Sequence, residues 1–274
     1  MQAHDPTPPA ATAAPRRAWA PDLKIAATWG VLAALSTLAV LPYLRQLTPQ
    51  AFEKIPVSFP VLAAAQSLQA LVLLGGLALL GLRMGHVVGL GSPLLRALVL
   101  RERVDWTRHR PLSSLALGVL AALAIVAASA LLDPMLPKPL HPPAQPGAAT
   151  SALNGLLASF YGGIAEELQM RLFLMTLVVW LCAAAGRRPA RDAMYWTGIV
   201  VAALLFGAGH LPAAHQVWGL SAIVVVRTVA LNAIGGLAFG WLYWKRGIEM
   251  AMLGHFGADL VLHVLAPLLA QAPQ

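Results

Sequence analysis

The ten residues GGIAEELQMR, at positions 162–171, decide how the rest of the chain is interpreted. They place two adjacent carboxylates and an arginine in the middle of an otherwise apolar stretch, residues 151–185. A charged side chain at the centre of a bilayer costs at least ~2.5–3.5 kcal/mol, so such a group of charges needs partners or a function. On a helix, Glu167 and Arg171 lie four positions apart on one face and can neutralise each other. Glu166 is rotated by about 100° around the helix axis and has no such local partner.

A paired carboxylate beside an unpaired one is the asymmetry on which acid–base chemistry depends, because two similar groups are then held in different states. Ionisable groups within membrane spans are functional by default. The alternative interpretation is a buried polar network that only holds helices together.

The composition of the chain indicates a membrane protein. Of its 274 residues, 58% are hydrophobic and only 11% are charged, whereas a soluble domain carries about 25% charged residues. The 19 Lys and Arg residues outnumber the 11 Asp and Glu residues. In a membrane protein this excess marks cytoplasmic loops and contact with anionic lipid, so we expect membrane lipid and not nucleic acid as a partner. The single cysteine excludes an intrachain disulfide and a cysteine metal site.

Seven apolar stretches are long enough to cross a bilayer as helices, namely residues 22–44, 61–82, 112–132, 151–185, 193–211, 219–244 and 248–269. Residues 1–21 are rich in proline and alanine and predict a disordered tail, and residues 22–150 hold the N-terminal transmembrane helices and loops. The basic stretch 93–106 predicts an amphipathic helix on the membrane surface. The predicted fold is therefore all-α, a polytopic membrane helix bundle of about seven transmembrane helices plus that surface helix.

The distribution of basic residues supports this number of spans. With a cytoplasmic N-terminus and alternating spans, only Arg45, Lys54 and Lys138 fall in outer segments, and most other Lys and Arg residues fall in inner ones. Cytoplasmic loops of multi-pass proteins carry such an excess of positive charge. Residues 212–218 are interpreted as a turn between the fifth and sixth spans.

Two later spans also carry ionisable residues. His210 ends the fifth span, and a histidine can hold a water, accept a proton or bind a metal. In the seventh span, His255 and Asp259 lie four positions apart on one face, where a carboxylate can fix the tautomer of an imidazole. The structural alternatives are a packed or interfacial histidine and a His–Asp hydrogen bond that only satisfies two buried groups. His263 is interpreted as a residue near the membrane interface, and His215 as a loop residue.

Together these stretches resemble the CAAX-protease and bacteriocin-processing (CPBP) family of intramembrane proteases, also called the abortive-infection family. The family pattern is Glu-Glu-x-x-x-Arg, then Phe-x-x-x-His, then His-x-x-x-Asn/Asp. The corresponding stretches here are Glu166–Arg171, Phe206–His210 and His255–Asp259. The resemblance covers about residues 151–265, and it implies that residues 151–270 form a catalytic membrane core.

The resemblance implies an endopeptidase, of the glutamic type, that hydrolyses a peptide bond with a glutamate-activated water in a membrane-embedded cavity. It implies that Glu166 is the general base, that His210 helps to hold the water, and that His255 and Asp259 stabilise the oxyanion. Developing negative charge is best stabilised by preorganised donors in a dry cavity.

Glu167 and Arg171 are then the orienting ion pair. The resemblance further implies a peptide or protein substrate, no cofactor, and a multi-pass location in a bacterial inner membrane with the N-terminus in the cytoplasm. No feature of the sequence indicates an oligomeric state.

Two alternatives stay open beside this interpretation. Position 259 is Asp, where a neutral Asn would be the better donor; an ionised Asp cannot donate, so it must be protonated, act through His255, or bind a metal. A zinc metalloprotease with Glu166, His210 and His255 as ligands is therefore one alternative, although the sequence contains no His-Glu-x-x-His stretch. The other is a non-catalytic membrane scaffold or bacteriocin-immunity partner.

The predicted helix bounds raise a question about depth. Straight helices at 1.5 Å per residue place His255 ~10 Å from the cytoplasmic side of its span, and Glu166 and His210 ~25 Å from that side. A common cavity then requires tilted helices or a 245–250 loop that is sunk into the protein.

Overall fold

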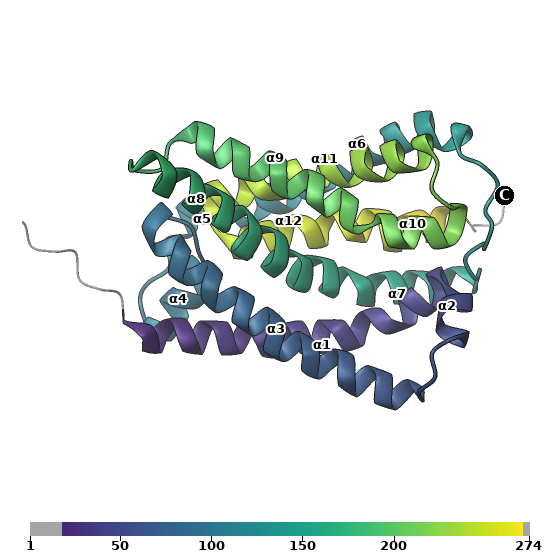
Figure 1. Cartoon of the computed structure of the whole chain (residues 1–274), viewed down its shortest axis with the longest axis horizontal. Helices are drawn as coiled ribbons and strands as arrows, with labels where there is room; N and C mark the ends of the chain where they lie inside the picture. Colours follow the sequence, from purple (N-terminus) through teal and green to yellow (C-terminus); the bar gives the residue numbers. More distant parts are fainter. Residues whose placement is uncertain (1–17, 271–274) are drawn as a thin grey trace, which may run out of the picture.

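The computed structural model describes residues 18–270 and shows a bundle of helices with no strand in that range (Figure 1). Within it, seven helical runs are long and apolar enough to cross a membrane: Trp19–Leu47, Phe59–Val88, Trp106–Met135, Ala148–Gly186, Asp192–Trp218, Ala222–Arg246 and Ile248–Ala270. This confirms the predicted all-α fold, and the protein is an integral, multi-pass membrane protein. The predicted tail, residues 1–21, lies mostly outside the described residues, and the first helix already begins at Trp19.

The long runs are built from shorter elements. The first half of the chain contains α1 (Trp19–Leu47), α2 (Pro49–Glu53), α3 (Phe59–Val88), α4 (Pro93–Leu100), α5 (Trp106–His109) and α6 (Pro111–Leu132). A single 3-10 turn, η1 (Asp133–Met135), follows α6. The second half contains α7 (Ala148–Phe160), η2 (Tyr161–Glu166), η3 (Leu168–Met175), α8 (Thr176–Gly186), α9 (Asp192–Gly209), α10 (Leu211–Trp218), α11 (Ala222–Arg246), α12 (Ile248–Asp259), η4 (Leu260–Leu265) and α13 (Ala266–Ala270).

The fourth span is one continuous helical run, as predicted, but its middle is wound as π-helix. The segments η2 and η3 lie on either side of Glu167. Wide turns of this kind are rare and are found frequently at functional sites. The GGIAEELQMR stretch is therefore exceptional in its backbone as well as in its charge.

The predicted turn at residues 212–218 is wrong. These residues form the helix α10, because Pro212 lies in its first turn, where a missing N–H leaves no hydrogen bond unmade. Gly219 then ends α10 with φ of 72°, a conformation that glycine adopts without strain. The sixth span consequently begins at Ala222 and not at Gly219.

The predicted amphipathic helix is present as α4 but ends at Leu100 instead of Trp106. Arg101 takes a left-handed conformation with φ of 57° and terminates α4. Asp105 then caps the separate short helix α5, since its carboxylate accepts a hydrogen bond from the backbone N–H of Thr107 at 3.0 Å. Figure 1 shows α4 and α5 at one end of the bundle, with α2 and α10 at the opposite end.

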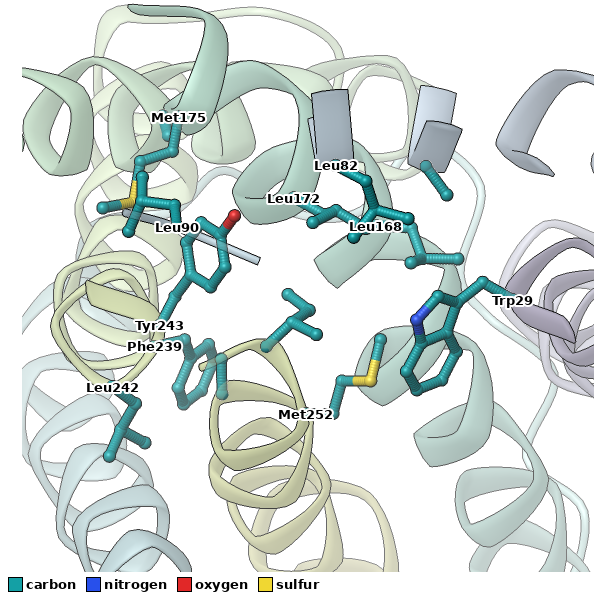
Figure 2. Packing of buried hydrophobic residues seen from close by; sticks show 14 of the residues in the cluster. Trp29, Leu82, Leu90, Leu168, Leu172, Met175, Phe239, Leu242, Tyr243 and Met252 are labelled. Atoms are coloured by element: carbon teal, nitrogen blue, oxygen red, sulfur yellow. The ribbon is translucent and has the colours of Figure 1, made fainter. Parts of the chain in front are cut away.

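The apolar core gathers around the fourth span. Leu168, Leu172 and Met175 are fully buried, and Figure 2 shows them in the same cluster as Trp29, Leu82, Phe239, Leu242, Tyr243 and Met252. Small residues allow the helices to approach this core closely. At Gly236 of α11, for example, a Cβ would lie 2.8 Å from Cα of Ala203 in α9. The charged stretch is thus enclosed by α1, α3, α9, α11 and α12.

The expected loop at residues 245–250 is reduced to Gly247, because α11 runs to Arg246 and α12 begins at Ile248, and the start of α12 is packed into the protein. Ile248 is fully buried, and its N–H donates to the carbonyl of Gly91 at 3.1 Å. The carboxylate of Glu249 accepts hydrogen bonds from Ser92 Oγ at 2.6 Å and from the N–H of Leu95 at 2.9 Å. The segment before and within α4 therefore covers the start of α12, the helix that carries His255.

Candidate active site

Glu167 and Arg171 make the ion pair that their spacing predicts. Arg171 Nη1 lies 2.8 Å from Glu167 Oε1, and both side chains are fully buried. Arg171 Nη2 also donates to the carbonyl of Gly236 at 3.3 Å. The guanidinium carbon lies 4.9 Å from the ring centre of Phe206 and 5.4 Å from that of Phe239, within the range of cation–π attraction.

Glu167 also binds His255, so this carboxylate joins the fourth span to α12. His255 Nδ1 lies 2.8 Å from Glu167 Oε1. A carboxylate paired with arginine can only accept, so Nδ1 carries the proton, and Nε2 is the ring atom that faces the site. The ring is stacked on Phe239, with 4.4 Å between centroids. The spacing indicated Asp259 as the partner that fixes this imidazole, but the hydrogen bond goes to Glu167.

His210 is oriented by its own helix. Its Nδ1 donates to the carbonyl of Phe206 at 2.9 Å, one turn earlier at the end of α9. The last carbonyls of a helix have no partner within the helix, so a side chain there can use one. The Phe206 ring also packs edge-on against the imidazole, with 4.8 Å between centroids. His210 therefore presents Nε2, as His255 does.

Both Nε2 atoms face the carboxylate of Glu166. Glu166 Oε1 lies 3.9 Å from His210 Nε2, and Oε2 lies 3.8 Å from His255 Nε2. Among residues 18–270, Glu166 makes no hydrogen bond, and its side chain is 22% exposed. The structure thus brings together three residues that are far apart in the sequence and leaves the carboxylate without a direct donor.

Asp259 lies near the same nitrogen of His255 that faces Glu166. Its Oδ1 is 3.7 Å from His255 Nε2, and its side chain is 11% exposed. A Cβ at Gly162 would lie 2.5 Å from Asp259 Oδ2 and 3.1 Å from His255 Nε2. Glycine at position 162 therefore keeps open the space into which this carboxylate and this imidazole point.

Sequence reasoning missed two residues that contact this group. His263, which was interpreted as an interfacial residue, has Nε2 at 3.8 Å from Asp259 Oδ1. Its Nδ1 lies 3.3 Å from the hydroxyl of Tyr43 in α1. The signal for His263 was present, since it follows Asp259 by the same four residues that separate Asp259 from His255. Tyr43 comes from a distant span and has no local spacing that could have indicated it.

The arrangement can bind and polarise a small polar molecule. A carboxylate accepts, and two imidazoles with fixed orientation can accept or donate through Nε2, depending on their protonation. Within the described part of the chain, no three His, Cys, Asp or Glu side chains are grouped in a geometry that would hold a metal ion.

The comparison with known families agrees with this site. Residues 148–261 match the family model described as Type II CAAX prenyl endopeptidase Rce1-like. No curated protein and no solved structure matches the chain. The matched residues include Glu166, His210, His255 and Asp259, and they leave out α1 to α6. The match supports an intramembrane endopeptidase function in general, with a lipid environment and a peptide substrate. The match over residues 148–261 thus supports the resemblance of the three motifs to the CPBP family of intramembrane proteases.

Proposed function

We propose that this protein is an intramembrane endopeptidase in which Glu166 activates the water that attacks a peptide bond. The observation that carries the proposal is the carboxylate of Glu166, which has no hydrogen-bond partner among residues 18–270 yet faces Nε2 of both His210 and His255. A partly exposed carboxylate with no donor from the protein keeps its acceptor capacity for a water or a substrate group. A water held by the two imidazoles would be the partner of this carboxylate.

In the proposed reaction, Glu166 takes a proton from this water while the water oxygen adds to the peptide carbonyl carbon. His210 Nε2 helps to orient the water. The carbonyl oxygen becomes an oxyanion, and the protonated form of His255 donates Nε2–H to it while Glu167 balances the charge of the ring. The C–N bond then breaks, and the proton on Glu166 passes to the leaving nitrogen. These steps account for every atom and proton of the hydrolysis.

The remaining residues act through these groups. Arg171 fixes Glu167, and Glu167 in turn fixes the orientation of His255. Asp259 stabilises charge on His255. We propose a cytoplasmic N-terminus on the basis of the basic loops, and membrane lipid as the medium through which substrate reaches the site.

The first test uses the purified full-length protein in lipid nanodiscs. The matched family is described as a CAAX prenyl endopeptidase, so the probes are a quenched fluorogenic peptide with a prenylated cysteine near its C-terminus and the same peptide without the lipid. We expect Glu166→Gln to abolish cleavage. The variant should still be folded and should unfold cooperatively on heating, as the wild-type protein does. The matched control is Glu102→Gln, since Glu102 is an exposed carboxylate outside the spans. Full biological effect of Glu166→Gln would instead support a non-catalytic scaffold or immunity partner.

A zinc metalloprotease is the alternative enzyme, because two imidazoles and a carboxylate are groups that zinc prefers. We propose that no cofactor takes part, so cleavage should survive exhaustive treatment with a chelator. Activity that is lost on chelation and restored by added zinc would favour Glu166, His210 and His255 as ligands.

A further inference from the structure

Three carboxylates lie in one series of contacts through His255, namely Glu166, Glu167 and Asp259. Arg171 compensates Glu167, and His210 faces Glu166. Asp259 is then the carboxylate that depends on a further donor, because His255 is already bonded to Glu167 and a nearly buried carboxylate without a donor is costly.

His263 lies where this donor is needed. Its Nε2 is 3.8 Å from Asp259 Oδ1, and His255 Nε2 is 3.7 Å from the same oxygen. Asp259 Oδ1 is therefore shared by two imidazoles, one of which, His255, is already bonded to Glu167. His263 has no competing carboxylate among the described contacts, because its other nitrogen faces the hydroxyl of Tyr43.

Tyr43 fixes the ring of His263. Its hydroxyl lies 3.3 Å from Nδ1, and the two rings meet edge to face with 5.3 Å between centroids. When the hydroxyl donates to Nδ1, a neutral His263 must carry its proton on Nε2, the atom that faces Asp259. Tyr43 belongs to α1, so a helix outside the matched residues 148–261 contributes to the site.

We propose that His263 is a positioning residue that pairs with Asp259 and is itself held by Tyr43. The Nε2–H of His263 is directed at Oδ1 of Asp259 and orients this oxygen, while Oδ2 stays directed at the space beside Gly162. His255 is then free to serve Glu167 and the substrate, and Glu166 is the carboxylate left without a partner. The effect on cleavage rests on the proposed function, whereas the pairing itself does not.

The pairing is tested by a double-mutant cycle on thermal stability in detergent, which needs no substrate. The variants are His263→Gln, Asp259→Asn and both together. If the two side chains interact, His263→Gln lowers Tm by about 2–4 °C in the wild-type background. The same substitution should have a much smaller effect in the Asp259→Asn background, where the carboxylate is replaced by a neutral amide that is a weaker acceptor. The control is His215→Gln, because His215 lies in α10 and its effect should simply add to that of Asp259→Asn.

The positioning role is tested by kinetics with the two fluorogenic peptides. We expect His263→Gln to lower kcat about tenfold with little change in KM, which is a loss of transition-state stabilisation and not of substrate binding. Tyr43→Phe should produce a smaller loss of the same kind, and this loss should disappear in the His263→Gln background. Asn keeps the shape of Asp and is neutral, so in the Asp259→Asn background His263→Gln should have little further effect on kcat.

The possible outcomes are distinct. Additive effects on Tm would overturn the pairing. If the effects on Tm are coupled but His263→Gln lowers kcat equally in the wild-type and Asp259→Asn backgrounds, the positioning role would be overturned. A wild-type protein that cleaves neither peptide would count against the proposed function, and the stability cycle would still support or overturn the pair.

Discussion

Asp22 and Glu166 are both carboxylates inside apolar spans, but their surroundings are opposite. Asp22 in α1 is fully buried and accepts hydrogen bonds from Arg83 Nη1 at 2.9 Å and His86 Nε2 at 2.8 Å. It also accepts one from Arg96 of α4. Glu166 is partly exposed, and its nearest described ionisable partners, His210 and His255, lie 3.8–3.9 Å away.

This difference distinguishes a carboxylate with a structural role from one that is available for chemistry in the same bundle. A carboxylate surrounded by donors joins helices, here α1, α3 and α4, and has no capacity left for a substrate. A carboxylate that is surrounded by oriented but distant groups keeps that capacity. Hydrogen bonding therefore distinguishes the anchoring group Asp22 from the proposed catalytic group Glu166.

The largest effect is expected at Arg171. Its side chain is fully buried, as Asp22 is, and it also belongs to the site that contains Glu166. Arg171→Met leaves Glu167 as a buried charge without its cation, so we expect a loss of about 3–5 kcal/mol in unfolding free energy. The measurement is thermal or denaturant unfolding in detergent. The control is Arg227→Met, which removes the half-exposed ion pair with Asp133 and should cost about 1 kcal/mol or less. Equal losses in the two variants would contradict the assignment.

Gly162→Ala should affect cleavage more than folding. Its Cβ would lie 2.5 Å from Asp259 Oδ2, so the carboxylate or the helix must move. A displacement of about 1 Å at a catalytic centre can cost about 100-fold in rate, and we expect a loss of kcat of that order. The control is Gly76→Ala in α3, where a Cβ would meet no atom within 4 Å. Full activity of Gly162→Ala would mean that the space beside Gly162 does not belong to the site.

The smallest expected effect is on the stability of Glu166 variants. Asp22→Asn weakens charged hydrogen bonds, each worth about 1.5–3 kcal/mol, and should destabilise the protein by a comparable amount. Glu166→Gln removes no hydrogen bond and should change the unfolding free energy by less than about 1 kcal/mol. The measurement is the unfolding free energy of both variants in detergent under identical conditions. A larger loss for Glu166→Gln than for Asp22→Asn would reverse the roles given to the two carboxylates.

Hydropathy and local spacing predicted much of this architecture. A bilayer demands long apolar helices, so the seven spans could be found without knowledge of their packing. The Glu167–Arg171 pair could be predicted because it lies within one helix. The end of α4 at Leu100 and the helix α10 could not, since they depend on a left-handed Arg101 and on the tolerance of a first helical turn for Pro212.

The site was harder to predict where its contacts cross between helices. The hydrogen bond of His255 to Glu167, and the approach of Tyr43 to His263, join residues from different spans and leave no periodic signal. The packing of the start of α12 involves Glu249, whose partners Ser92 and Leu95 are distant in the sequence. Spacing within a span indicates a pair, and only tertiary packing decides which partner each group takes.

The π-helical turns on either side of Glu167 have a geometric consequence. A π turn holds more residues than an α turn, so the wide turns on either side of Glu167 change the angle around the helix axis between successive side chains. Glu167 is held by Arg171 and His255, whereas the neighbouring Glu166 faces the two Nε2 atoms without a hydrogen bond to either. The winding of the backbone thus directs two adjacent glutamates to different surroundings.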